Sequence, residues 1–132
     1  MTRTLSLWLP VAIYMGAIFL ASADSSPPAP AQVSDKVLHL GAYAGLAVTI
    51  CRALAGGLPS RLSLRVMTIA FVSTVAYGTS DELHQMFVPG RSPDVYDVAA
   101  DAAGAAVGLI GCWAWGIIRP LGSHLPPTNS ST

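Results

Sequence analysis

Four closely spaced residues are the first in the chain that could do chemistry together: Asp35, Lys36, His39 and Tyr43. An α-helix has about 3.6 residues per turn, so Asp35, His39 and Tyr43 would share one stripe of a helix. Histidine titrates near neutral pH, and beside a carboxylate it can act as a general base. The stripe also fits an ordinary helix start, in which Asp35 favours the helix dipole and His39 is a satisfied interior side chain.

A second polar group lies further along the chain: Ser73, Thr74, Tyr77, Asp81, Glu82, His84 and Gln85. Helical periodicity places all of these except Glu82 on roughly one third of a helix, with Glu82 about 100° away. Because a carboxylate facing lipid costs several kcal/mol, we expect Asp81 to point into the protein and Glu82 toward water. Asp81, Glu82 and His84 are candidate acid–base residues, and Gln85 is a candidate binding residue. A purely structural hydrogen-bond network is the alternative.

A third group begins at Arg91, which follows a turn-forming Pro-Gly pair. A guanidinium group matches the geometry of a carboxylate or a phosphate. Arg91 is therefore expected either to bind an anionic substrate or to neutralise an acid, the candidates being Asp81, Asp94 and Asp97.

The acids after Arg91 continue into a stripe of small residues. Asp94, Asp97 and Asp101 recur at i, i+3 and i+7, and Gly104 and Gly108 extend the same helical face. Small residues four apart allow two helices to approach closely in a membrane. We expect this face to be buried, which would bring Asp97 and Asp101 beside other helices as candidate binding residues.

No metal site and no cofactor are predicted. A divalent cation held by Asp81, Glu82, His84 and Asp97 has no established ligand motif behind it. Cys51 and Cys112 lack cysteine or histidine partners at metal-ligand spacing. We expect both to be reduced core residues rather than a disulfide.

The elements that position these residues are expected to lie in a membrane. Hydrophobic residues make up 52% of the 132 residues and charged residues only 11%, against about 25% charged in ordinary soluble domains. The mean hydropathy is +0.54. A formal net charge of zero argues against nucleic acid as a partner and leaves the lipid bilayer as the expected one.

Four apolar stretches are long enough to cross a hydrocarbon core, which takes roughly 20 helical residues. They are residues 5–23, 37–54, 64–85 and 95–118, and they predict an all-α polytopic membrane four-helix bundle. One domain over residues 1–121 and a disordered tail over 122–132 are expected. The first stretch also resembles a secretory signal with a cleavage site near Ala21-Ser22-Ala23, although it is longer than the usual signal core.

The basic residues predict how the bundle is oriented. Five of them fall on one side (Arg3, Arg52, Arg61, Arg65 and Arg119), and two, Lys36 and Arg91, fall on the other. Both termini and the Gly56-Gly57-Leu58-Pro59 turn are therefore expected in the cytoplasm. The acidic groups would then face outward, as would the proline-rich connection that starts at Ser25.

The polar groups, taken together and in order, resemble the VanZ-like family of membrane proteins, which is named for a teicoplanin-resistance determinant. Asp35-Lys36 with His39 and Tyr43 is similar to the family's opening pattern. The run from Ser80 to Gln85, followed by 87–91, is similar to its central signature, and Asp97 with Gly104 to its closing one. Ser22 matches a serine common after the first helix, whereas Asp101 stands where asparagine is frequent. The resemblance covers most of the chain.

The resemblance implies an integral protein of the cell envelope, in a bacterial plasma membrane, with a link to glycopeptide resistance. Three hypotheses for the polar groups remain open. One is an enzyme acting on a lipid-linked or cell-wall substrate, with His39 or His84 as base, a carboxylate orienting it, and Arg91 holding phosphate. Another is a non-catalytic binder of an anionic headgroup or a drug. The third is ion or proton movement along the Tyr77 and Ser73 stripe, which the apolar lower halves of the second and fourth helices disfavour. The sequence does not determine the oligomeric state.

Overall fold

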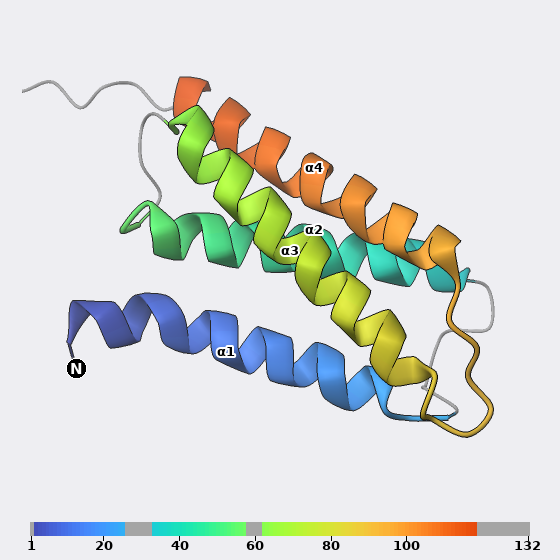
Figure 1. Ribbon diagram of the computed structural model, residues 1–132. Coiled ribbons are helices and arrows are strands. Elements are labelled where there is room, and N and C mark those ends of the chain that lie inside the picture. The colour runs from blue at the N-terminus through green and yellow to red at the C-terminus, as the bar shows by residue number, and fades with distance from the viewer. Residues whose placement is uncertain (1, 26–32, 58–61, 119–132) are drawn as a thin grey trace, which may run out of the picture.

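The computed structural model describes residues 2–25, 33–57 and 62–118, and it is all-α over these residues (Figure 1). The four helices are α1 (Arg3–Ser22), α2 (Asp35–Leu54), α3 (Leu64–Gln85) and α4 (Val95–Ile118). The predicted all-α class is confirmed, and each predicted stretch corresponds to one helix. The proline-rich connection, the Leu58-Pro59 part of the turn and the predicted tail lie outside the described residues.

Three of the four helices are long and apolar enough to cross a membrane: α1, α2 and the Val95–Gly116 part of α4. Their outer surfaces carry large apolar side chains that bilayer lipid would cover, such as Ile13, Leu20 and Ile110. α3 has 22 residues, enough to span, but its polar stripe keeps it outside this group. That α3 spans and that both termini are cytoplasmic therefore remain predictions.

Helices α2 and α4 form the closest contact in the bundle, and two glycines of α4 make it possible. A Cβ at Gly104 would overlap the carbonyl oxygen of Leu40 and lie 2.9 Å from its carbonyl carbon. At Gly108 the same atom would overlap the carbonyl oxygen of Ala44. Because no side chain separates the two backbones, the acids one turn earlier on α4 are held against α2, as the small-residue stripe predicts.

Helix α1 lies beside α2 and α3 and is attached by a few polar contacts. The Tyr77 hydroxyl donates a 2.7 Å hydrogen bond to the carbonyl of Met15, and the Arg3 guanidinium donates to the carbonyl of Gly56 at 2.9 Å. Tyr14 packs against Gly45 of α2. α1 therefore closes one side of the bundle without joining its tightest core.

The core itself lies between α2, α3 and α4 and contains Tyr43, Leu46, Ala70 and Ala105. Cys51 and Cys112 are buried free thiols within it, as predicted. The end of α1, the start of α2, the end of α3 and the start of α4 meet at one end of the bundle (Figure 1). This end, called the polar end below, carries the acidic groups.

Candidate functional site

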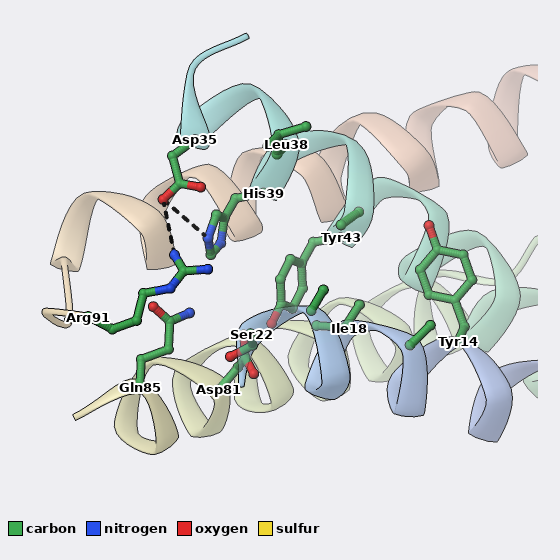
Figure 2. A pocket seen from close by; sticks show the side chains of 13 residues that line it. Tyr14, Ile18, Ser22, Asp35, Leu38, His39, Tyr43, Asp81, Gln85 and Arg91 are labelled. Atoms are coloured by element: carbon green, nitrogen blue, oxygen red, sulfur yellow. Dashed lines mark ion pairs between the residues drawn. The ribbon is translucent and has the colours of Figure 1, made fainter. Parts of the chain in front are cut away.

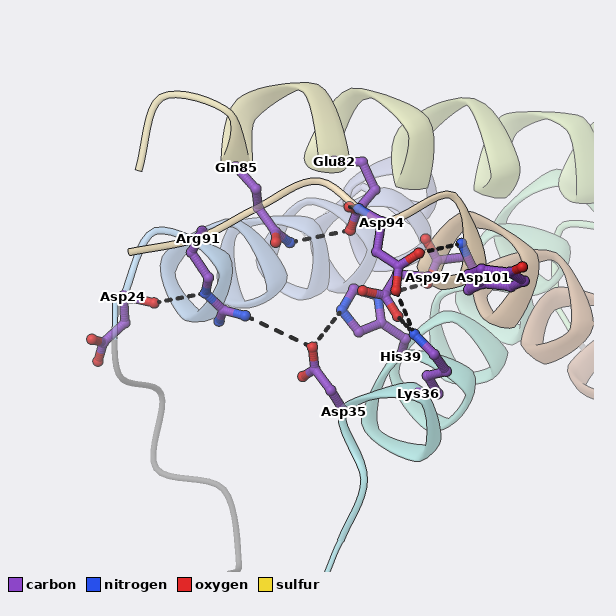
Figure 3. Close-up of polar contacts among 11 residues, drawn as sticks. Asp24, Asp35, Lys36, His39, Glu82, Gln85, Arg91, Asp94, Asp97 and Asp101 are labelled. Carbon is purple, nitrogen blue, oxygen red and sulfur yellow. Dashed lines mark hydrogen bonds and ion pairs between the residues drawn. The ribbon is translucent and has the colours of Figure 1, made fainter. Parts of the chain in front are cut away.

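Lys36 joins the starts of α2 and α4 at the polar end (Figure 3). Its ammonium donates 2.8 Å hydrogen bonds to Oδ2 of Asp94 and to Oδ1 of Asp97. Asp94 also accepts a 2.8 Å hydrogen bond from the backbone N–H of Tyr96, which satisfies a donor in the first turn of α4. The Lys36 hydrogen bond, followed by the Tyr96 one, lowers the pKa of the Asp94 carboxyl from its ordinary value. Three of the predicted residues thus form one ion network.

His39 is positioned by a buried carboxylate. Its Nδ1 lies 2.9 Å from Oδ1 of Asp101, and the Asp101 side chain is fully buried. An ionised carboxylate there accepts a hydrogen bond from Nδ1–H, which leaves Nε2 free to face elsewhere. Nε2 lies 4.0 Å from Oδ2 of Asp35. The pairing of a base with an orienting acid is therefore present at His39, as one hypothesis required.

The predicted position of Glu82 is wrong. Its side chain is buried rather than turned to water, with 4% of the residue exposed. Oε2 accepts a 3.0 Å hydrogen bond from the backbone N–H of Asp94, and Oε1 accepts one of 3.3 Å from Nε2 of Gln85. The physical reason is that the loop after α3 folds back over the helix end and supplies a backbone donor to the carboxylate.

Arg91 contacts none of the three acids that were predicted as its partners. Its Nε donates a 3.2 Å hydrogen bond to the carbonyl of Asp24, and its Nη1 lies 3.9 Å from Oδ2 of Asp35. Gly90, which precedes it, has a φ of +81° that favours glycine. The turn at this glycine directs Arg91 toward α1 and α2 instead of α4.

A cavity of about 310 Å³ lies between α1, α2 and α3 and reaches the loop at Arg91 (Figure 2). Its walls change in character along its length. The part near Tyr14 and Ile18 is apolar, whereas the part at the polar end is lined by Asp35, His39 and Arg91. Small-molecule sites are typically cavities of this size with mostly apolar walls and a few placed polar groups.

Between these two parts lie three buried polar groups on three different helices: Ser22 of α1, Tyr43 of α2 and Asp81 of α3. Each is at least nine-tenths buried. The Oγ of Ser22, the hydroxyl of Tyr43 and Oδ1 of Asp81 make no hydrogen bond to any described residue. Buried polar atoms are rarely left without a partner, so these three mark a place where a bound group would be stabilised. The interior position predicted for Asp81 is confirmed.

His84 does not belong to this cavity. Its ring packs against Phe19 of α1, with the ring centroids 4.5 Å apart, and it does not line the cavity walls. Its Nε2 is buried without a hydrogen-bond partner among the described residues. The fold therefore brings together His39, Tyr43, Asp81, Gln85 and Arg91 at the cavity, whereas His84 lies outside the cavity walls, against Phe19.

Among the described residues, one set of two acids and a histidine could hold a cation. Ligand atoms of Asp35, His39 and Asp97 lie within 4.8 Å of one another. This is a different set from the one weighed on the sequence, which shares only Asp97 with it. Asp97 is already neutralised by Lys36, so the geometry gives a cation little uncompensated charge.

The comparison with protein families agrees with these motifs. The sequence model of the VanZ/LLP1 family matches residues 11–118, which hold every residue discussed at the cavity and in the ion network. The chain belongs to the VanZ/LLP1 family. No curated protein and no solved structure matches it significantly. Membership in the family, together with three apolar helices of spanning length, makes the chain an integral membrane protein.

The sequence patterns did not predict that α1 contributes to the site. Tyr14, Ala17 and Ile18 supply much of the apolar wall, and nothing in their order distinguishes them from lipid-facing residues. Ser22 was noticed only because it matches the family. A polar residue at the end of an otherwise apolar helix was the one signal that α1 faces a site.

Proposed function

We propose that this VanZ/LLP1 protein binds an anionic, lipid-linked component of the cell envelope in the cavity between α1, α2 and α3. The apolar chain of the ligand would lie beside Tyr14 and Ile18, and its anionic group near Arg91. The polar end would face outward, as the distribution of basic residues predicts. On this proposal the protein lies in the bacterial plasma membrane.

The proposal is supported by the change in the cavity wall, which is apolar near Tyr14 and Ile18 and charged near Arg91. An amphipathic ligand gains from burying its chain against apolar side chains and from placing its charge at a guanidinium. Arg91 is held by a backbone carbonyl and by a 3.9 Å contact to Asp35, whose side chain is about half exposed. That contact is long and partly hydrated, so a phosphate would displace it at low cost.

Binding to the purified protein in detergent tests the proposal. The probes are palmitoyl lysophosphatidic acid and farnesyl phosphate, and isothermal titration measures the affinity. Arg91→Ala should weaken binding of both by about tenfold or more, because a charge-assisted hydrogen bond is lost. Arg65→Ala, at the exposed opposite end of α3, is the matched control and should change nothing.

A second pair of variants tests where the apolar chain of the ligand lies. Ala17→Trp would fill the apolar part of the cavity, whereas Ala12→Trp adds the same ring to an exposed position outside it. We expect the first to abolish binding and the second to preserve it. Unchanged affinity in both Arg91→Ala and Ala17→Trp would reject the cavity as the binding site.

The family resemblance suggests that binding contributes to glycopeptide resistance. Susceptibility of cells that express the wild type or Asp81→Asn, at equal membrane levels, measures this contribution. A shift seen with the wild type and lost in the variant would support it. No shift with the wild type would leave a structural or lipid-binding role without resistance, which is the alternative.

The His39 and Asp101 pair favours acid–base chemistry as a second candidate. Nε2 of His39 lies at the cavity wall, where it could take a proton from a bound hydroxyl or water. His39→Gln should then abolish turnover of a bound lipid while its affinity stays within about twofold. Absence of turnover in the wild type, measured by mass spectrometry of the bound lipid, would reject this candidate.

A further inference from the structure

The order of chemical groups along the cavity limits which amphiphile fits it. From the interior toward the polar end, the walls are first apolar, then carry Ser22, Tyr43 and Asp81, and finally carry Arg91 (Figure 2). His39 lies between the two levels, and its ring centroid is 6.1 Å from that of Tyr43. Its Nε2 is 4.0 Å from Oδ2 of Asp35, which lies 3.9 Å from Nη1 of Arg91. A ligand that matches all three zones has its groups in the same order.

The middle zone offers both hydrogen-bond donors and acceptors to a ligand. A carboxylate oxygen such as Oδ1 of Asp81 can only accept while it is ionised, and the hydroxyls of Tyr43 and Ser22 can both donate and accept. A ligand hydroxyl satisfies the group, because it donates to Asp81 and accepts from Tyr43. An ester or ether oxygen at this level can only accept, so it would add no hydrogen bond to Asp81 and would leave that carboxylate dependent on the Tyr43 or Ser22 hydroxyl.

We infer that the ligand is a monoacyl glycerophosphate, with its free glycerol hydroxyl against Asp81 and Tyr43 and its phosphate near Arg91. This inference rests on the proposed function and specifies its ligand. In a monoacyl glycerophosphate the order is chain, hydroxyl, phosphate, as in the cavity. In a sugar joined to a lipid through phosphate the order is chain, phosphate, hydroxyl, which would place the anion beside Asp81. A second acyl chain would replace the hydroxyl with an ester.

The volume of the cavity agrees with a ligand that has a single acyl chain. A volume of about 310 Å³ corresponds to roughly ten water-sized groups at about 30 Å³ each. A glycerophosphate has about that many non-hydrogen atoms, so it would occupy most of the cavity, and a single chain would continue past Tyr14 and Ile18 along the lipid-facing side of α1. Two acyl chains would not enter side by side.

A series of lipids that differ in one group tests the inference. Isothermal titration with the full chain in detergent compares palmitoyl lysophosphatidic acid, its 2-deoxy analogue, dipalmitoyl phosphatidic acid and farnesyl phosphate. We expect the first to bind about 10- to 100-fold more tightly than the 2-deoxy analogue, since one hydrogen bond to a charged acceptor is lost. The other two lipids should bind no better than the 2-deoxy analogue.

Two variants connect that preference to the residues. In Tyr43→Phe and Asp81→Asn the ratio of the two affinities should fall toward one, and in Ser80→Ala, whose exposed hydroxyl bonds only its own helix, it should not change. If Tyr43→Phe or Asp81→Asn fails to fold, the comparison of the four lipids on the wild type still tests the inference. Equal affinity for lysophosphatidic acid and its 2-deoxy analogue would overturn the inference, as would tighter binding of farnesyl phosphate, and both results would leave the proposed function intact. Absence of binding by all four lipids would overturn the two together.

Discussion

Replacing Gly104 with alanine should destabilise the bundle, because the added methyl group has no room between α2 and α4. The new Cβ would lie 2.9 Å from the carbonyl carbon of Leu40 and 3.0 Å from its Cα. Carbon atoms pack best about 3.5–4.0 Å apart. The two helices would therefore have to separate by roughly 0.5–1 Å at this level.

The cost follows from that separation. A gap of about 0.5–1 Å removes a quarter to a half of the dispersion energy of the atoms that face it, and overpacked sites typically lose about 1–3 kcal/mol. Alanine is otherwise the better helix former, by about 1 kcal/mol in a helix interior. Subtracting that gain leaves a net loss of up to about 2 kcal/mol in the free energy of unfolding, which is up to about 30-fold in the equilibrium constant, and a loss of about 1–3 kcal/mol relative to a Gly→Ala change that meets no neighbour.

Unfolding of the purified protein in mixed micelles, followed by circular dichroism during titration with a denaturing detergent, measures this change. Gly111→Ala is the matched control, because it lies on the same helix and a Cβ there would meet nothing within 4 Å. The control should be neutral or slightly stabilising. If Gly104→Ala unfolds with the same midpoint as Gly111→Ala, the close approach of α2 and α4 is not what stabilises the bundle.

Two further predictions concern the attachment of α1 and the ion network. Tyr77→Phe should lower the free energy of unfolding by about 1 kcal/mol, because the hydrogen bond to the carbonyl of Met15 is lost. Tyr96→Phe, at a residue that is 68% exposed, should not, and equal melting temperatures of the two variants would contradict the role of that bond. The hydrogen bond from Lys36 holds the pKa of Asp94 below its ordinary value of about 4, so its stabilising contribution is complete above about pH 4 and is lost as the pH falls through the lower pKa of the folded state. The melting temperatures of the wild type and Asp94→Asn should therefore differ at pH 7 and converge at low pH, and a difference that persisted at low pH would show that the carboxylate charge is not its cause.

Much of the site could be predicted from the sequence where the inference depended on a single helix. Helical spacing predicted that Asp35, His39 and Tyr43 share one face, and the structure places all three on the cavity wall. The interior position of Asp81 followed from the cost of an acid in lipid. The small residues at Gly104 and Gly108 indicated a close helix contact, which α2 provides.

The errors concern residues in and beside the loop after α3. Glu82 was expected to face water, since nothing local indicates that the N–H of Asp94, twelve residues later, returns to its carboxylate. Of the two roles expected for Arg91, pairing with Asp81, Asp94 or Asp97 is not found, because Arg91 reaches Asp24 and Asp35 instead; binding of an anionic group stays a prediction. The path of a short loop depends on how the helices that it joins are packed, and helical periodicity carries no information about that.

The sequence by itself determined that the chain forms four helices, which of their faces are polar, and that the acids gather at one end. These properties follow from helix geometry and from the cost of placing charge in a membrane, and both act on residues close together in the chain. Only the tertiary structure decided that His39 meets Asp101, 62 residues away, and that α1 closes a cavity over Tyr43 and Asp81. Which polar face meets which is set by the fit of whole helices against one another, and no local pattern specifies it.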